Sequence, residues 1–107
     1  IGLAAAAVAV PAVRPGCAHA YHLYVIRTAD RDGLQAFAAA RGVATAIHYP
    51  LPVHRQGAYA GRLPVGAGGL AQTEALAGRI LSLPMHPFLT DGQVERVIEV
   101  IGEGAGR

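Results

Sequence analysis

The sequence contains no lysine, because all nine of its basic residues are arginines. No side chain can therefore supply the amine that forms a Schiff base with a carbonyl compound. There is a single cysteine, Cys17, which excludes an internal disulfide and a zinc site made of four thiolates. A chain with this cysteine content is expected in a reducing, cytoplasmic setting.

Charge is also scarce. Charged residues make up 15% of the 107-residue sequence, and the arginines are scattered singly along it. The formal charge of +2 therefore forms no basic run or helix face of the kind that binds nucleic acid. The uncharged run at residues 1–13 is too short to cross a bilayer, and it precedes the first charge, Arg14, whereas a signal peptide has its basic stretch first. We expect neither a nucleic-acid partner nor a membrane partner.

The length and the first residues indicate one domain taken from a longer polypeptide. With 107 residues there is room for a single domain of ordinary size. The sequence is 52% hydrophobic, but much of this is alanine and valine, so the core is expected to be thin. No initiator methionine is present. Residues 1–18 are interpreted as a segment that leads into a domain at 19–107.

Three strands are predicted from the residue pattern. Residues 20–27 are rich in aromatic and β-branched side chains, which favour strands. Residues 43–49 alternate between two faces with a two-residue period, and Pro50 ends the run. Residues 80–83 read as a short buried strand that ends at Pro84.

Two of the three predicted helices lie between these strands. Asp30 is placed to cap the first, which runs to about Arg41, with Gly42 suited to the left-handed conformation just beyond it. The second is a short helix over residues 71–79, which follows a glycine-rich connection at 61–69.

The third helix is predicted near the end of the chain. Thr90 and Gln93 have the spacing of a capping box. The apolar residues after them recur with helical spacing, and residues 102–107 are expected to fray. The order strand, helix, strand, helix, strand, helix predicts a two-layer α/β (α+β) fold, with a small, mainly antiparallel sheet and helices on one face.

Polar side chains gather at the end of the strand predicted at 43–49 and in the loop that follows. His48 and Tyr49 lie at the strand end, and Pro50 and Pro52 stiffen the chain after them. Rigidly held polar groups on a loop are typical of a ligand site. The polar residues of the loop are His54, Arg55, Gln56 and Tyr59. We predict that His48, Tyr49 and His54 bind substrate, and we assign no catalytic, cofactor-binding or metal-binding residue to the chain.

Each candidate also has a structural interpretation. His48 and Tyr49 point to opposite faces of the predicted strand, so either could instead be a core residue with a satisfied hydrogen bond. His54 fits a site-facing role and a helix-capping role equally well. Arg55 could bind a carboxylate or a phosphate, but a lone arginine is also typical of a solvated surface.

Two other classes of function stay open on the residues alone. His48, His54 and His86 could supply three ligands to zinc, although their separations match no short ligand motif. The chain could also be a non-catalytic module, a small ligand-binding or dimerisation domain with a ferredoxin-like fold.

Several blocks of the sequence, taken together and in order, resemble a known family. They are similar to the C-terminal part of the DegT/DnrJ/EryC1/StrS aminotransferases, pyridoxal-phosphate enzymes that aminate keto sugars on nucleotide carriers. The resemblance covers about His19 to Ile101. It is specific because Ile-His-Tyr-Pro-x-Pro-x-His-x-Gln, from Ile47, and Leu-Ser-Leu-Pro-Met, from Leu81, occur together. The blocks are residues 19–27, 31–34, 42–59, 80–87 and 89–91.

The resemblance implies the C-terminal small domain of a fold-type I aminotransferase. In that family a large N-terminal domain supplies the Schiff-base lysine and binds most of the pyridoxal 5'-phosphate. The small domain closes over the cofactor and helps to hold the sugar, usually in a homodimer. The expected function is transfer of an amino group, with glutamate as the expected donor, to a keto group of a nucleotide-linked sugar. The chain alone is expected to be inert.

Overall fold

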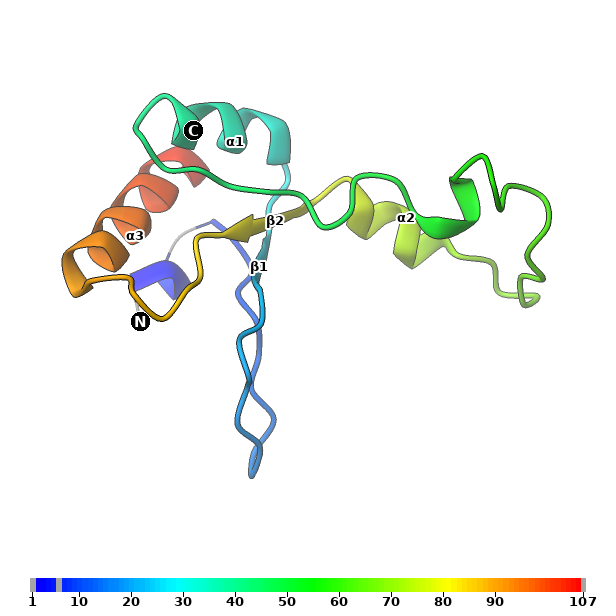
Figure 1. Cartoon of the computed structure of the whole chain (residues 1–107), viewed down its shortest axis with the longest axis horizontal. Helices are drawn as coiled ribbons and strands as arrows, with labels where there is room; N and C mark the ends of the chain where they lie inside the picture. Colours follow the sequence, from blue (N-terminus) through cyan, green and yellow to red (C-terminus); the bar gives the residue numbers. More distant parts are fainter. Residues whose placement is uncertain (1, 6, 107) are drawn as a thin grey trace.

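The structure is a computed structural model that describes residues 2–5 and 7–106. Within these residues two antiparallel strands, three α-helices and two short 3-10 helices are formed (Figure 1). In chain order the elements are η1 (Gly2–Ala5), β1 (Tyr24–Arg27), α1 (Arg31–Ala39), η2 (Val53–Arg55), α2 (Ala71–Ala77), β2 (Ile80–Leu83) and α3 (Asp91–Ala105).

The sheet is built around the antiparallel pair of β1 and β2, in the register that places Tyr24 opposite Leu83. Two single bridges extend it on either side. Ala46 pairs with Ser82 of β2, and Ala9 pairs with the last residue of β1. Across the sheet the order is therefore residue 46, β2, β1 and residue 9. The small antiparallel sheet predicted from the sequence is confirmed.

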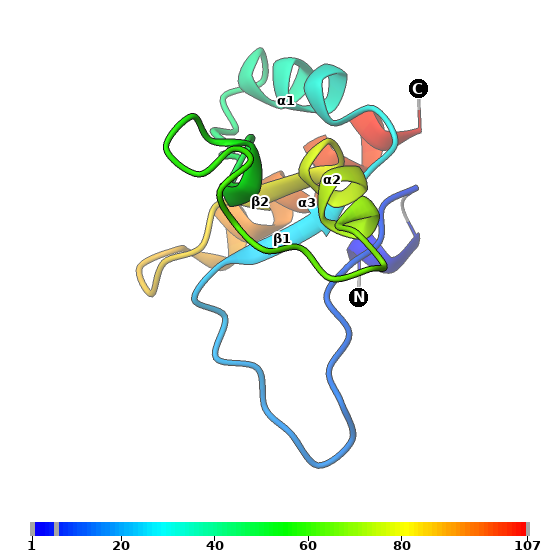
Figure 2. The ribbon, with the colours of Figure 1, turned by 90° about the vertical axis from the view of Figure 1, so that its right-hand side faces the viewer.

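The hydrophobic core lies between this sheet and the layer formed by α1 and α3 (Figure 1). Alternation along β2 points Leu81 and Leu83 into the core and Ser82 to the opposite face. The two-layer architecture is confirmed, while α2 lies on the other side of the strand pair from α3 (Figure 2). The buried core residues are Leu3, Ile26, Leu34, Ala38, Val43, Leu81, Leu83, Val100 and Ile101.

Both predicted helix caps are confirmed. At the start of α1, the Gly33 N–H donates to Asp30 Oδ1 over 2.9 Å. At the start of α3, the Gln93 N–H donates to Thr90 Oγ1 and the Thr90 N–H donates back to Gln93 Oε1, which completes the capping box. Beyond α1, Gly42 has a φ of +77°, the left-handed conformation that glycine adopts at little cost.

The strand predicted at 43–49 is wrong, because only Ala46 pairs with the sheet. Two backbone groups that precede Ala46 are used elsewhere. The Val43 N–H donates to the Ala38 carbonyl at the end of α1, and the Thr45 carbonyl accepts from the side-chain amide of Gln35. On this side of Ala46, the end of α1 and the Gln35 side chain thus take backbone groups that a longer ladder would need.

Other predicted boundaries shift for identifiable reasons. The first strand begins at Tyr24 instead of residue 20, because its partner β2 ends before Pro84 and offers residues 20–23 nothing to pair with. The fraying predicted for residues 102–107 is wrong for residues 102–105, since α3 continues to Ala105, and Arg107 lies outside the described residues. Close packing of the last turn of α3 against Leu34 and Phe37 of α1 accounts for this length. The helix predicted at 71–79 ends at Ala77.

Within the segment predicted at 1–18, of which residues 1 and 6 lie outside the described residues, η1 belongs to the same packed unit. Leu3 of η1 is 8% exposed within the core, and η1 contacts α3. Residues 10–23 then form an arm that extends from the body of the molecule in both views (Figure 1, Figure 2). Among the described residues, none of the helices has the length and apolar character needed to cross a membrane. A boundary at residue 18 stays a prediction.

Candidate functional site

His48 lies beside β2, on the face of the sheet turned away from α1 and α3. Its Nδ1 atom is 2.9 Å from Ser82 Oγ. The hydroxyl belongs to a residue that is only 3% exposed, whereas His48 itself is half-buried. The imidazole is thus anchored at one nitrogen by a buried group, which leaves its Nε2 atom for another partner.

Tyr49 follows His48 but is much more accessible, with 72% of its surface exposed. Its ring meets the imidazole of His48 edge to face, with 5.5 Å between ring centroids. Such a pair is mutually attractive. The two predicted residues are therefore together, one anchored to the sheet and one projecting from it.

His54 contacts a different element, α2. Its Nε2 atom lies 2.9 Å from Oε1 of Glu74, in the first turn of α2. Arg55 Nε donates to the same oxygen over 2.9 Å. One carboxylate thus joins the loop at η2 to α2, and it engages Nε2 of His54 and Nε of Arg55.

The carboxylate of Glu74 is electrostatically stabilised by this arrangement. The hydrogen bond from His54 lowers the pKa of Glu74 below its ordinary value of 4.5, and that from Arg55 lowers it further. Hydrogen bonds to the charged form of a carboxylate favour that form. Glu74 is therefore ionised at neutral pH and holds the loop as an anion.

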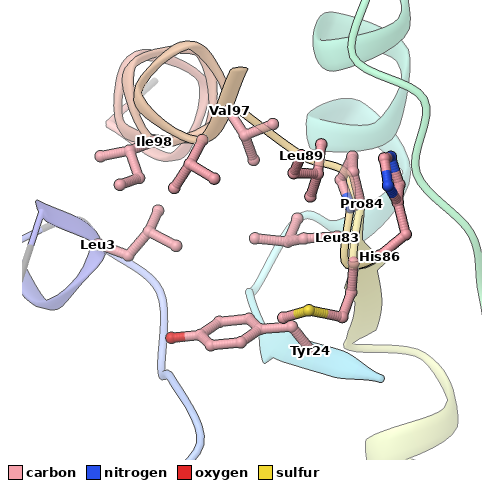
Figure 3. Close-up of a pocket in the computed structure, with 10 residues that line it drawn as sticks. Leu3, Tyr24, Leu83, Pro84, His86, Leu89, Val97 and Ile98 are labelled. Atoms are coloured by element: carbon pink, nitrogen blue, oxygen red, sulfur yellow. The ribbon is translucent and has the colours of Figure 1, made fainter. Parts of the chain in front are cut away.

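A hollow of about 330 Å³ lies elsewhere, at the end of β2 nearest α3. Figure 3 shows Leu3, Leu83 and Ile98 around it, with the ring of Tyr24 along one side. None of the three predicted substrate-binding residues lines it. Because its lining is mostly apolar, this hollow suits packing against apolar groups better than recognition of a charged nucleotide sugar.

The zinc alternative finds no support. In the described part of the chain, no three His, Cys, Asp or Glu side chains lie close enough together to hold a metal ion. His48 and His54 are bound to Ser82 and Glu74 respectively. His86 lines the apolar hollow.

Neither Ser82 nor Glu74 was predicted to belong to the site, although both had a recognisable signal. Ser82 is the polar residue of an otherwise apolar four-residue strand. Glu74 is the only acidic residue between Asp32 and Asp91, so it is the carboxylate nearest in the sequence to the cations of the loop. Neither signal predicts which residue is the partner, because His48 and Ser82 are 34 residues apart in the chain and His54 and Glu74 are 20 apart.

The family model of the DegT/DnrJ/EryC1/StrS aminotransferases matches residues 2–102. The chain belongs to this family. The match includes the segments that carry His48, His54, Glu74 and Ser82. The family assignment made from the sequence blocks is confirmed.

Curated relatives of this family member include transaminases of nucleotide sugars. The dTDP-3-amino-3,4,6-trideoxy-alpha-D-glucose transaminase of Streptomyces venezuelae is 41% identical over 94% of the chain. The dTDP-3-amino-3,6-dideoxy-alpha-D-galactopyranose transaminase of Aneurinibacillus thermoaerophilus is 33% identical over 86% of it. The matched regions are 26% and 24% of those proteins, so the chain spans about a quarter of their length.

Solved structures of family members share this fold. A DegT DnrJ EryC1 StrS aminotransferase from Brucella abortus superposes with a TM-score of 0.91, at 40% identity over 99% of the chain and 28% of that protein. DesV of S. venezuelae, solved in complex with a ketimine intermediate, superposes with a TM-score of 0.89, at 41% identity over 99% of the chain and 29% of that protein. The described residues therefore adopt a fold found as one part of larger aminotransferases.

Proposed function

We propose that this chain is the C-terminal small domain of a pyridoxal-phosphate-dependent transaminase that aminates a keto group of a nucleotide-linked sugar. The observation that carries the proposal is the similarity, along 94% of the chain, to a transaminase of a dTDP-linked amino sugar. The relatives extend well beyond the matched region, which accords with an upstream domain carrying the rest of the site.

In this proposal His48 and Tyr49 contact the sugar substrate. The anchored imidazole presents one nitrogen to hydroxyl or phosphate oxygens, and the exposed phenol adds an adjacent donor and acceptor. His54, predicted as a third contact, has its Nε2 engaged by Glu74. We infer that His54 contributes mainly by holding the loop in place, with its Nδ1 atom left for substrate.

The residues of this chain do not fit covalent attachment of pyridoxal phosphate, because the sequence has no lysine. When bound, this cofactor supplies the electron sink for amino transfer. We propose that the lysine and most cofactor contacts belong to the upstream domain. The part played by this chain is to bind and orient the sugar and to exclude water from the reacting groups.

The remaining features of the proposal concern partners and setting. Glutamate is the proposed amino donor, the assembly is proposed to be a homodimer, and the setting is proposed to be cytoplasmic. Mass measurement of the complete polypeptide in solution tests the dimer. Replacing glutamate by other amino acids in the assay tests the donor.

The decisive experiment compares the complete polypeptide with the 107-residue chain whose N-terminal amine is acetylated. We expect the complete polypeptide to show the visible absorption of covalently bound pyridoxal phosphate and to aminate a keto nucleotide sugar. The acetylated chain should show neither property. Covalent cofactor binding by that chain, or a gene that begins at Ile1 without an upstream lysine-bearing domain, would overturn the proposal.

A further inference from the structure

Ser82 is a buried polar residue in a position where an apolar one would be expected. Its neighbours in β2, Leu81 and Leu83, point into the core, and Ser82 points to the face that carries His48. It is bridged on both sides, to Val25 of β1 and to Ala46. With two neighbouring backbones fixing its strand, the hydroxyl has a well-defined position.

The donors and acceptors of Ser82 and His48 can both be satisfied in only one tautomer of His48. Among the described residues, the Ser82 hydroxyl has one hydrogen-bond partner, Nδ1 of His48 at 2.9 Å. If Nδ1 carried the proton, it would donate to Oγ, and the hydroxyl proton would be left without an acceptor in a buried place. If the hydroxyl donates to Nδ1, both groups are satisfied. The imidazole proton then resides on Nε2.

We propose that Ser82 is a positioning residue that holds His48 as the Nε2–H tautomer and fixes the direction of its ring. His48 then presents a hydrogen-bond donor to an oxygen acceptor of the nucleotide sugar, a hydroxyl or a phosphate oxygen. This inference rests on the proposed function, in which His48 contacts the sugar. It adds the proton's location and the residue that determines it.

The tautomer is measured directly by nitrogen-15 NMR of the His48 ring in the complete polypeptide at neutral pH. The wild-type protein should show a protonated Nε2 and an unprotonated Nδ1. Ser82→Ala should mix the two tautomers, and Ser82→Thr, which keeps the hydroxyl, should restore the wild-type pattern. A wild-type ring protonated at Nδ1, or a pattern unchanged in Ser82→Ala, would overturn the proposal.

Kinetics test whether the fixed tautomer matters for the reaction. Loss of one hydrogen bond predicts that Ser82→Ala lowers kcat/KM for the sugar roughly three- to tenfold, with Ser82→Thr close to wild type. Thr45→Val is the matched control, because it removes another buried hydroxyl that has no hydrogen-bond partner among the described residues. It should change neither the NMR pattern nor kcat/KM.

The two readouts separate this inference from the proposed function. If His48→Ala lowers kcat/KM and Ser82→Ala does not, the positioning role of Ser82 is overturned. If Ser82→Ala mixes the tautomers and neither variant affects kcat/KM, the tautomer assignment stands and the proposed contact of His48 with the sugar is wrong.

Discussion

Gly104 of α3 lies directly against Leu34 of α1. A Cβ atom at Gly104 would be 2.6 Å from Leu34 Cδ1 and 2.7 Å from Phe37 Cδ1. Leu34 is 3% exposed, so its side chain has little room to move away. Because glycine has no Cβ atom, the last turn of α3 can approach α1 this closely at Gly104.

Gly104→Ala should destabilise the protein by roughly 1 kcal/mol. Overpacking a core costs about 1–3 kcal/mol, and the better helix propensity of alanine returns up to about 1 kcal/mol. Gly102→Ala is the matched control in the same helix, because nothing lies within 4 Å of a Cβ at that position. It should stabilise by up to about 1 kcal/mol. Urea unfolding measures both, and equal effects would refute the close contact.

Thr45→Val should stabilise the protein by about 1 kcal/mol. The Oγ1 atom of Thr45 is buried and has no hydrogen-bond partner among the described residues, which is a costly arrangement. Valine keeps the shape and removes the unsatisfied hydroxyl. Thr73→Val on exposed α2 is the control and should change the free energy of unfolding by less than about 0.5 kcal/mol. A loss of stability in Thr45→Val would mean that the hydroxyl has a partner after all.

Glu74→Gln should speed amide hydrogen exchange in η2 and α2 at neutral pH. The folded-state pKa of Glu74 is lowered by His54 and then by Arg55, so its contribution is complete above the unfolded-state pKa. That contribution is lost as the pH falls through the folded-state pKa. Glutamine resembles the protonated carboxyl, so wild type and Glu74→Gln should differ at neutral pH and converge in acid.

Amide hydrogen exchange over residues 53–55 and 71–77, corrected for the intrinsic effect of pH, measures this difference. Glu95→Gln on α3 is the control, since Glu95 has no ion-pair partner among the described residues. It should leave exchange in these segments unchanged. Equal exchange in wild type and Glu74→Gln at neutral pH would show that the ion pairs do not hold the loop.

His48→Ala in the complete polypeptide should raise the KM for the sugar or lower kcat, while covalent cofactor binding persists. The reason is that His48 is proposed to offer a hydrogen bond to the substrate, and the proposed cofactor site lies in another domain. Loss of such a contact lowers kcat/KM by roughly tenfold. His22→Ala, on the exposed arm, is the control. An unchanged kcat/KM for His48→Ala would mean that His48 does not bind the sugar and has only a structural role.

Much of the fold follows from local rules. The capping box at Thr90 and Gln93, the cap at Asp30 and the left-handed Gly42 each depend on residues within a few positions of one another. Such interactions can be read from spacing alone. The family was likewise recognisable from motifs, because the blocks around His48 and Ser82 are short and contiguous in the sequence.

The tertiary structure decided the features that depend on distant partners. Whether residues 43–49 form a strand depends on which backbone groups α1 takes, and the length of α3 depends on how closely Gly104 approaches α1. The sequence by itself determined which polar residues are available for a site. Only the tertiary structure decided that Ser82 holds His48 and that Glu74 holds His54. The partners in these two pairs are separated by 34 and by 20 positions in the chain. They meet through the packing of the whole domain, which no local spacing encodes.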